Sequence, residues 1–269
     1  MRVIFRYVAT PLSVLTRNRD FRSLFAAQLV VYGADWFVMV PLLALLPDLT
    51  GSGIWGAFVL ALDTGIVALL LPFTGTVADR IDRKKIIITA NVVTLVAVLA
   101  LLGVGSGTAW LALVAISGVA VAKGFYSPAA QAALPNVLDP EDLAAGNALA
   151  GSAWGTMTVV GASLGGLLAE AVGPYTCFWI AAVSLALAAI FTSRIRRPLQ
   201  AGHADGSAAP NAFAAIAEAL RYIGRRPRVL ALVTVKSAVG LGNGVLTVFP
   251  LLAGVYGVGS IGTGLLFGV

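Results

Sequence analysis

Long apolar runs recur along the whole chain of 269 residues and limit the folds that it can adopt. Runs such as 86–103, 110–122 and 176–192 approach or reach the roughly 20 apolar residues that a helix needs to cross about 30 Å of hydrocarbon. Apolar residues make up 59% of the sequence and charged residues only 11%, whereas a soluble domain has about 25% charged residues. The sequence therefore predicts an all-α, polytopic membrane protein.

The apolar runs divide the chain into eight predicted membrane segments. They cover residues 21–46, 54–77, 85–104, 109–127, 143–169, 175–193, 229–253 and 260 onward. We expect residues 1–193 to form a six-helix transmembrane bundle, residues 194–228 to form a cytoplasmic linker and residues 229–269 to begin a second bundle. Apolar residues recur at helical spacing within the linker, which predicts an amphipathic helix on the membrane surface. They are Phe213, Ile216, Leu220 and Ile223.

Lysine and arginine gather at one end of the predicted bundle. Five lie at or before the start of the first segment, four follow the second segment and seven lie in the linker, whereas the alternate loops contain none. By the positive-inside rule, this distribution predicts a cytoplasmic N-terminus. We expect the membrane to be the plasma membrane, the inner membrane of a bacterium. The basic residues behind the formal charge of +6 thus lie where membrane topology places them. We therefore expect membrane lipids as partners and no nucleic acid.

A short internal repeat suggests two related halves. GADWFVMVPLLA begins at Gly33 and GNGVLTVFPLLA begins at Gly242, 209 residues later. Six helices, a basic linker and a restart match the plan of transporters that are built from two parallel six-helix repeats. We therefore expect a truncated transporter that ends inside its eighth helix. The alternative is a non-transporting membrane fragment, or an assembly partner of a split transporter.

The loop between the second and third segments carries a recognisable pattern, Gly75-Thr-Val-Ala-Asp79-Arg80-Ile-Asp82-Arg83-Lys84-Lys85. It resembles the signature loop of the major facilitator superfamily, G-x-x-x-D-R-x-G-R-[KR]-[KR], with aspartate at position 82 in place of glycine. The resemblance implies the six-helix N-terminal bundle of that family and the first one to two helices of its C-terminal bundle. We expect Gly75 to let its helix turn closely, Asp79 to cap a neighbouring helix and the basic run to contact anionic lipid heads.

Other stretches resemble the drug and siderophore exporters of this superfamily. They include the lead that begins at Asn18, and Ser127-Pro-Ala and Leu134-Pro135, which we place after the fourth helix. Gly161-Ala-Ser-Leu-Gly165-Gly166 resembles the G-P-x-x-G-G element of proton-coupled exporters, with alanine in place of proline. The resemblance implies proton-coupled efflux of a small molecule, such as a drug, a macrolide or a siderophore-like compound.

The same helix carries small residues on one face. The stripe consists of Gly151, Gly155, Thr158, Ala162, Gly165 and Ala169. Small residues let two membrane helices approach closely, so the residues alone predict a packing surface at this stripe.

Charged residues inside the apolar segments mark a candidate path for substrate and proton. An ionised side chain at the middle of a membrane helix costs about 2.5–3.5 kcal/mol, so such residues should face a cavity or one another. We assign this path to Gln28, Tyr32, Asp35, Asp63 and Lys123, while Lys236 lies in the seventh segment. Asp63 and Lys123 form a hypothetical pair, and Asp35 lacks an evident cationic partner, which makes it the first choice for proton coupling. The alternative is that buried pairs only fix the register of the helices.

The sequence offers little support for an enzyme. Gly161-Ala-Ser163-Leu-Gly165 matches G-x-S-x-G, but it lies in an apolar segment without a preceding strand, and the only histidine, His203, is in the linker. Cys177 is the only cysteine, which excludes a disulfide framework and a metal site built from several cysteines. We expect no enzymatic activity, no cofactor and no metal.

Overall fold

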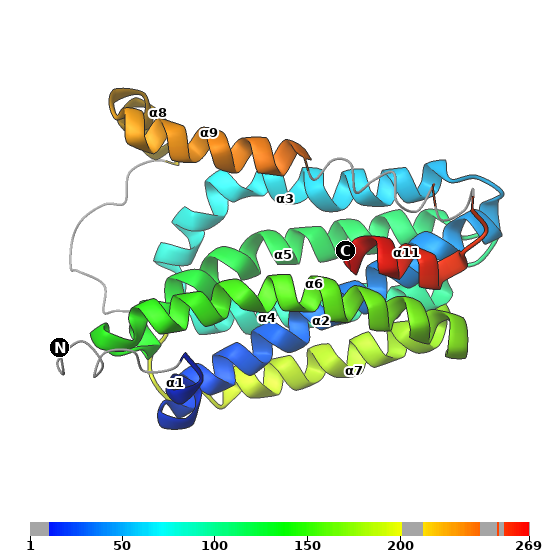
Figure 1. The fold of residues 1–269 in the computed structure, drawn as a ribbon, viewed down its shortest axis with the longest axis horizontal. Helices are drawn as coiled ribbons and strands as arrows, with labels where there is room; N and C mark the ends of the chain where they lie inside the picture. Colours follow the sequence, from blue (N-terminus) through cyan, green and yellow to red (C-terminus); the bar gives the residue numbers. More distant parts are fainter. Residues whose placement is uncertain (1–10, 201–211, 243–251, 253–255, 269) are drawn as a thin grey trace, which may run out of the picture.

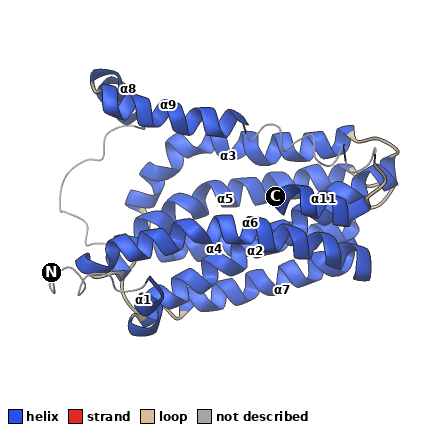
Figure 2. Cartoon of the chain, in the orientation of Figure 1, coloured by secondary structure: helices blue, strands red, loops and turns tan. Residues whose placement is uncertain are grey.

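The protein was analysed as a computed structural model that describes residues 11–200, 212–242, 252 and 256–268 (Figure 1). Its described residues form helices joined by short loops and contain no strand (Figure 2). The α-helices are α1 Pro11–Arg17, α2 Arg19–Thr50, α3 Ile54–Arg80, α4 Arg83–Ala100, α5 Trp110–Val137, α6 Leu143–Val172, α7 Pro174–Ser193, α8 Ala212–Arg225, α9 Pro227–Gly242 and α11 Gly259–Gly268. Short 3-10 helices, Leu101–Gly103 and Pro140–Asp142, continue α4 and precede α6. The predicted all-α fold is confirmed.

Six of the described helices, α2 to α7, are long and apolar enough to cross a membrane, and the predicted polytopic class is confirmed. They pack side by side as one bundle (Figure 1). Helix α8 covers the predicted amphipathic segment of the linker, and α9 and α11 overlap the last two predicted segments. Residues 243–251, which include the centre of the proposed repeat, lie outside the described residues.

Prolines inside the membrane helices do not end them. Helix α5 continues through Pro128 and Pro135 to Val137, so the expectation that these prolines follow the fourth helix is wrong. A membrane helix tolerates proline where neighbouring helices and local adjustments compensate the lost hydrogen bond. This part of α5 is packed tightly, since Ala129 and Ala133 are fully buried. Burial at these alanines outweighs the helix-breaking tendency that the sequence suggested.

The loops at one end of the bundle hold most of its charged contacts. We call this end the basic end: it contains α1, the α3–α4 turn, the α5–α6 loop and residues 193–200. Two apolar clusters of buried side chains fill the bundle. One is centred on residues 34–46, 97–119 and 178–185, and the other on residues 14–24, 78–90 and 122–138 towards the basic end. Asp35 and Lys123 lie where the two clusters meet along α2 and α5.

Candidate functional site

A charged cluster joins three helices in the middle of the bundle. The Lys123 ammonium of α5 lies 3.1 and 3.0 Å from the two carboxylate oxygens of Asp35 on α2. It also lies 2.9 and 3.0 Å from the two carboxylate oxygens of Asp63 on α3. The suggested pairing of Asp63 with Lys123 is therefore present. The expectation that Asp35 lacks a cationic partner is wrong, because residues 88 positions apart in sequence gave no sign of this contact.

The cluster has more negative than positive formal charge. A lysine ammonium has three hydrogens to donate, whereas Asp35 and Asp63 together present four carboxylate oxygens. Two ionised carboxylates and one ammonium leave a formal charge of −1 among helices whose buried side chains are mostly apolar. An uncompensated charge is unfavourable in such surroundings, so the cluster has room for one further positive charge.

A cavity of about 480 Å³ opens beside this cluster. It is lined mainly by α2, α4, α5 and α6, and by Leu185 of α7. Four of the residues that the sequence assigned to the path line it: Gln28, Tyr32, Asp35 and Lys123. Asp63 approaches Lys123 from α3 and is not among the lining residues. The two carboxylates therefore differ, because Asp35 lines the cavity and Asp63 does not.

Three lining residues have buried polar atoms without a hydrogen-bond partner in the described part of the chain. These atoms are Gln28 Oε1, Asn91 Nδ2 and the Tyr126 hydroxyl oxygen. The three residues are 1%, 2% and 3% exposed, so bulk water does not reach these atoms. Unpaired buried polar atoms are rare in proteins, and each calls for an explanation such as a ligand or an ordered water.

Sequence analysis did not single out Asn91 and Tyr126. Tyr126 follows Lys123 by three residues and shares its helical face, so the spacing could have identified it. Asn91 is one polar residue in an apolar run, and its place in the cavity depends on how α4 packs against α2 and α5. Lys236 lies in α9, but its side chain is outside the described part of the structure.

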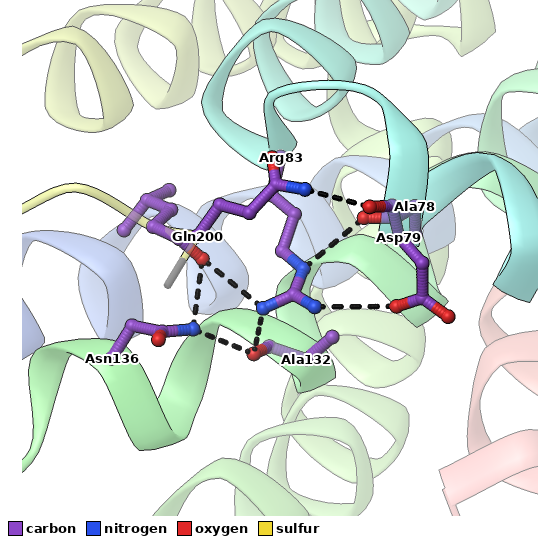
Figure 3. Close-up of polar contacts among 7 residues, drawn as sticks. Ala78, Asp79, Arg83, Ala132, Asn136 and Gln200 are labelled. Atoms are coloured by element: carbon purple, nitrogen blue, oxygen red, sulfur yellow. Dashed lines mark hydrogen bonds and ion pairs between the residues drawn. The ribbon is translucent and has the colours of Figure 1, made fainter. Parts of the chain in front are cut away.

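The signature loop lies at the basic end, and none of its residues lines the cavity. Figure 3 shows the polar contacts around Arg83 in this loop. The Arg83 guanidinium donates to the carbonyl oxygens of Ala78, Ala132 and Leu199 at 3.2, 2.8 and 3.3 Å, and pairs with Asp79 at 3.3 Å. Lys84 Nζ donates to the carbonyl oxygens of Ser193 and Ile195 at 2.9 and 2.7 Å. The loop thus attaches residues 193–200 to the bundle.

Further contacts hold the same segment. Asn136 Nδ2 donates to the Leu199 carbonyl oxygen at 2.9 Å, and Gln200 Nε2 donates to the Asp79 carbonyl oxygen at 2.8 Å. The Asp20 carboxylate of α2 accepts the backbone N–H groups of Arg196 and Arg197. The start of the predicted linker, residues 194–200, therefore packs against the first bundle.

The described residues do not support two expectations for the loop. The residue that caps a helix here is Asp82, which accepts the Lys84 N–H at 2.8 Å, while Asp79 pairs with Arg83. Aspartate at position 82 thus replaces the glycine of the family pattern with a favourable N-cap. A side chain at Gly75 would meet no described atom within 4 Å, so no close approach explains this glycine. Arg80 ends α3 with an exposed side chain.

The glycine stripe of α6 packs closely over only part of its length. A Cβ atom at Gly165 would lie 2.9 Å from the Trp36 carbonyl oxygen of α2, and one at Gly161 would lie 3.2 Å from the Trp36 side chain. Gly166 adjoins Gly264 of α11. At Gly151 and Gly155 no described atom lies within 4 Å of such a Cβ, so the predicted contact at this pair is absent from the described structure.

Comparison with known proteins identifies a family. The profile of the Major Facilitator Superfamily matches residues 24–269. A putative bacilysin exporter, BacE of Bacillus amyloliquefaciens, is 30% identical over 197 residues, which are 72% of this chain and 49% of the exporter. An uncharacterized transporter of Bacillus subtilis, YceJ, is 27% identical over 172 residues, 63% of this chain and 43% of YceJ. The ectoine/proline transporter ProP of Corynebacterium glutamicum is 39% identical over 71 residues, 26% of this chain and 14% of ProP. The chain thus spans at most about half the length of these relatives.

Proposed function

The chain belongs to the Major Facilitator Superfamily, and we propose that it moves a small molecule across the plasma membrane by secondary transport in exchange for protons. The observation that supports this proposal best is the Lys123 cluster, in which one ammonium faces two carboxylates beside a cavity of about 480 Å³. Ionisable residues inside membrane segments are expensive, and they commonly mark substrate paths and proton relays.

Within this proposal the two carboxylates have different roles. Asp63 neutralises Lys123 and positions its ammonium. We assign this role to Asp63 because it is the less exposed carboxylate and does not line the cavity. Asp35 borders the cavity and carries the charge that remains uncompensated. Asp35 takes up a proton when the site is empty and releases it when a substrate binds.

The proposed direction is efflux. The short stretches that resemble exporters agree with the similarity to a putative bacilysin exporter, which covers 72% of this chain. The proposed substrate is a small drug-like, macrolide-like or siderophore-like molecule, and a cavity of this size falls in the range of sites for drug-sized ligands. The basic end, including the N-terminus, faces the cytoplasm in this proposal.

The test uses the protein expressed from its complete reading frame in everted membrane vesicles. Bacilysin, ectoine and proline, the compounds named for two relatives, serve as probes. We expect at least one probe to enter the vesicles and discharge an imposed proton gradient. Asp35→Asn, which keeps the shape but cannot titrate, should abolish this coupled movement, whereas Asp48→Asn at the exposed end of α2 should leave it unchanged.

Transport by Asp35→Asn at the wild-type rate from about pH 6 to about pH 8 would place the coupling elsewhere. Loss of folded protein in that variant would support a purely structural role for the pair. The alternative function, assembly with a second membrane polypeptide, predicts that such a polypeptide co-purifies and that transport needs both.

A further inference from the structure

We infer that the cavity binds a peptide-like amine, a molecule with one cationic amino group and an amide group about 10 Å away. The inference names the ligand class of the proposed transport site and rests on that proposal for its biological meaning. It depends on three features of the cavity: its charge, its unpaired polar atoms and their spacing.

The charge selects a cation. The Lys123 ammonium is held by Asp63 and Asp35 together, and the cluster has a formal charge of −1 beside the cavity whenever Asp35 is ionised. An amino group entering the cavity meets the Asp35 carboxylate, whose side chain is 28% exposed. A second anion at this position would instead add to the uncompensated charge. A monocation therefore fits this end of the cavity better than a neutral or anionic group.

The unpaired polar atoms select an amide. Gln28 Oε1 is an acceptor without a donor, and Asn91 Nδ2 is a donor without an acceptor. The N–H and C=O of one amide group supply a donor and an acceptor together, whereas an alkyl chain supplies neither. The Tyr126 hydroxyl, also unpaired, offers a further hydrogen bond to the same ligand. A ligand that lacks matching hydrogen-bonding groups would leave these buried atoms unpaired, and it would therefore bind much more weakly.

The spacing sets the length of the ligand. Gln28 precedes Asp35 by seven residues on α2, which corresponds to about 10 Å along the helix axis. Asn91 lies at nearly the same level as Gln28, because it is the ninth residue of α4 and Gln28 is the tenth residue of α2, both counted from the basic end. An extended peptide spans about 3.3–3.6 Å per residue, so three residues bridge the two subsites.

A binding experiment with three probes of similar length tests each feature separately. Trialanine amide carries the amine and the amides, N-acetyl-trialanine amide lacks the cation, and heptylamine lacks the amides. Isothermal titration calorimetry on the purified protein in detergent should give trialanine amide a dissociation constant at least about tenfold below that of either control. Equal binding of heptylamine overturns the amide subsite, and equal binding of the acetylated peptide overturns the cation subsite. No measurable binding of trialanine amide at millimolar concentration overturns the inference as a whole.

Matched variants locate the subsite. Asn91→Leu should weaken binding of trialanine amide about tenfold, because it removes the unpaired donor and keeps the volume. Asn136→Leu is the control: Asn136 does not line the cavity, and its amide donates to the Leu199 carbonyl oxygen at 2.9 Å at the basic end. It should change the affinity less than about twofold. Asn91→Ala provides a second variant if Asn91→Leu does not fold. Wild-type affinity for trialanine amide in either folded variant would contradict the assignment of Asn91.

The result is separable from the proposed transport function. Binding of trialanine amide without any coupled movement of the three vesicle probes or of trialanine amide itself would contradict transport and leave the ligand class standing. Coupled movement of a vesicle probe, together with no binding of trialanine amide, would contradict the ligand class alone.

Discussion

Replacing Lys123 with methionine tests whether one ammonium holds the central cluster together. Methionine keeps much of the apolar stem but removes a charge that lies 2.9–3.1 Å from four carboxylate oxygens. The change leaves Asp35 and Asp63 facing each other with a formal charge of −2. Removing one partner of a buried ion pair destabilises proteins by about 3–5 kcal/mol. Because these side chains are 16–28% exposed, we expect the lower limit, about 3 kcal/mol of unfolding free energy.

The assay is reversible unfolding of the purified protein in mixed detergent micelles, followed by circular dichroism. Lys85→Met serves as the control, since it makes the same substitution at an exposed position of the α3–α4 region and should change stability by less than about 0.5 kcal/mol. Adding Asp63→Asn to Lys123→Met restores the formal charge of the cluster to −1, as in the wild type. This double variant should therefore recover most of the lost stability.

Equal stability of Lys123→Met and Lys85→Met would refute the reasoning, because the central ammonium would then stabilise nothing. Failure of Asp63→Asn to recover stability in the double variant would also count against it. That outcome would mean that the loss comes from packing of the lysine stem and not from uncompensated carboxylates.

Three further predictions concern packing, capping and topology. Gly165→Ala should lower the unfolding free energy by about 1–3 kcal/mol in the same micelle assay, because its Cβ would press on the Trp36 carbonyl oxygen. Gly151→Ala should lower the unfolding free energy little or not at all. Equal losses in the two variants would contradict the packing of α6 on α2. Asp82→Ala should cost about 1 kcal/mol, also measured by unfolding, and Asp82→Asn should retain most of the cap; an alanine variant as stable as the wild type would remove the role of the N-cap. On a background without the native cysteine, a cysteine at position 48 should react with an impermeant thiol reagent from outside the cell and one at position 203 should not; the reverse pattern would invert the proposed orientation.

The membrane segments were predictable because hydrophobicity over about 20 residues reflects the solvent around the helix and not its partners. All six membrane-spanning helices of the first bundle overlap the predicted segments. The ends were less predictable where prolines occur, as at Pro128 in α5, because buried neighbours decide whether a helix tolerates a missing N–H. The capping role of Asp82 was missed because the family pattern has glycine there and directed attention to Asp79.

The central site was only partly predictable. The cost of charge in hydrocarbon is enough to mark Asp35, Asp63 and Lys123 from the sequence alone. The contact of one ammonium with both carboxylates depends on how three helices pack. The residue spacing within a single helix does not show how that helix packs against the others. The unpaired amide of Asn91 could not be predicted for the same reason, since an unpaired atom is defined by its whole surroundings.

The central claim is that a proton and a cationic substrate alternate at Asp35. The most direct measurement is the number of protons released when trialanine amide is added to the purified protein in a weakly buffered solution. We predict release of about one proton for each amine bound by the wild type, affinity that falls as the pH falls, and no release by Asp35→Asn. Binding of the amine with no proton release by the wild type, or with the same release by Asp35→Asn, would contradict the claim.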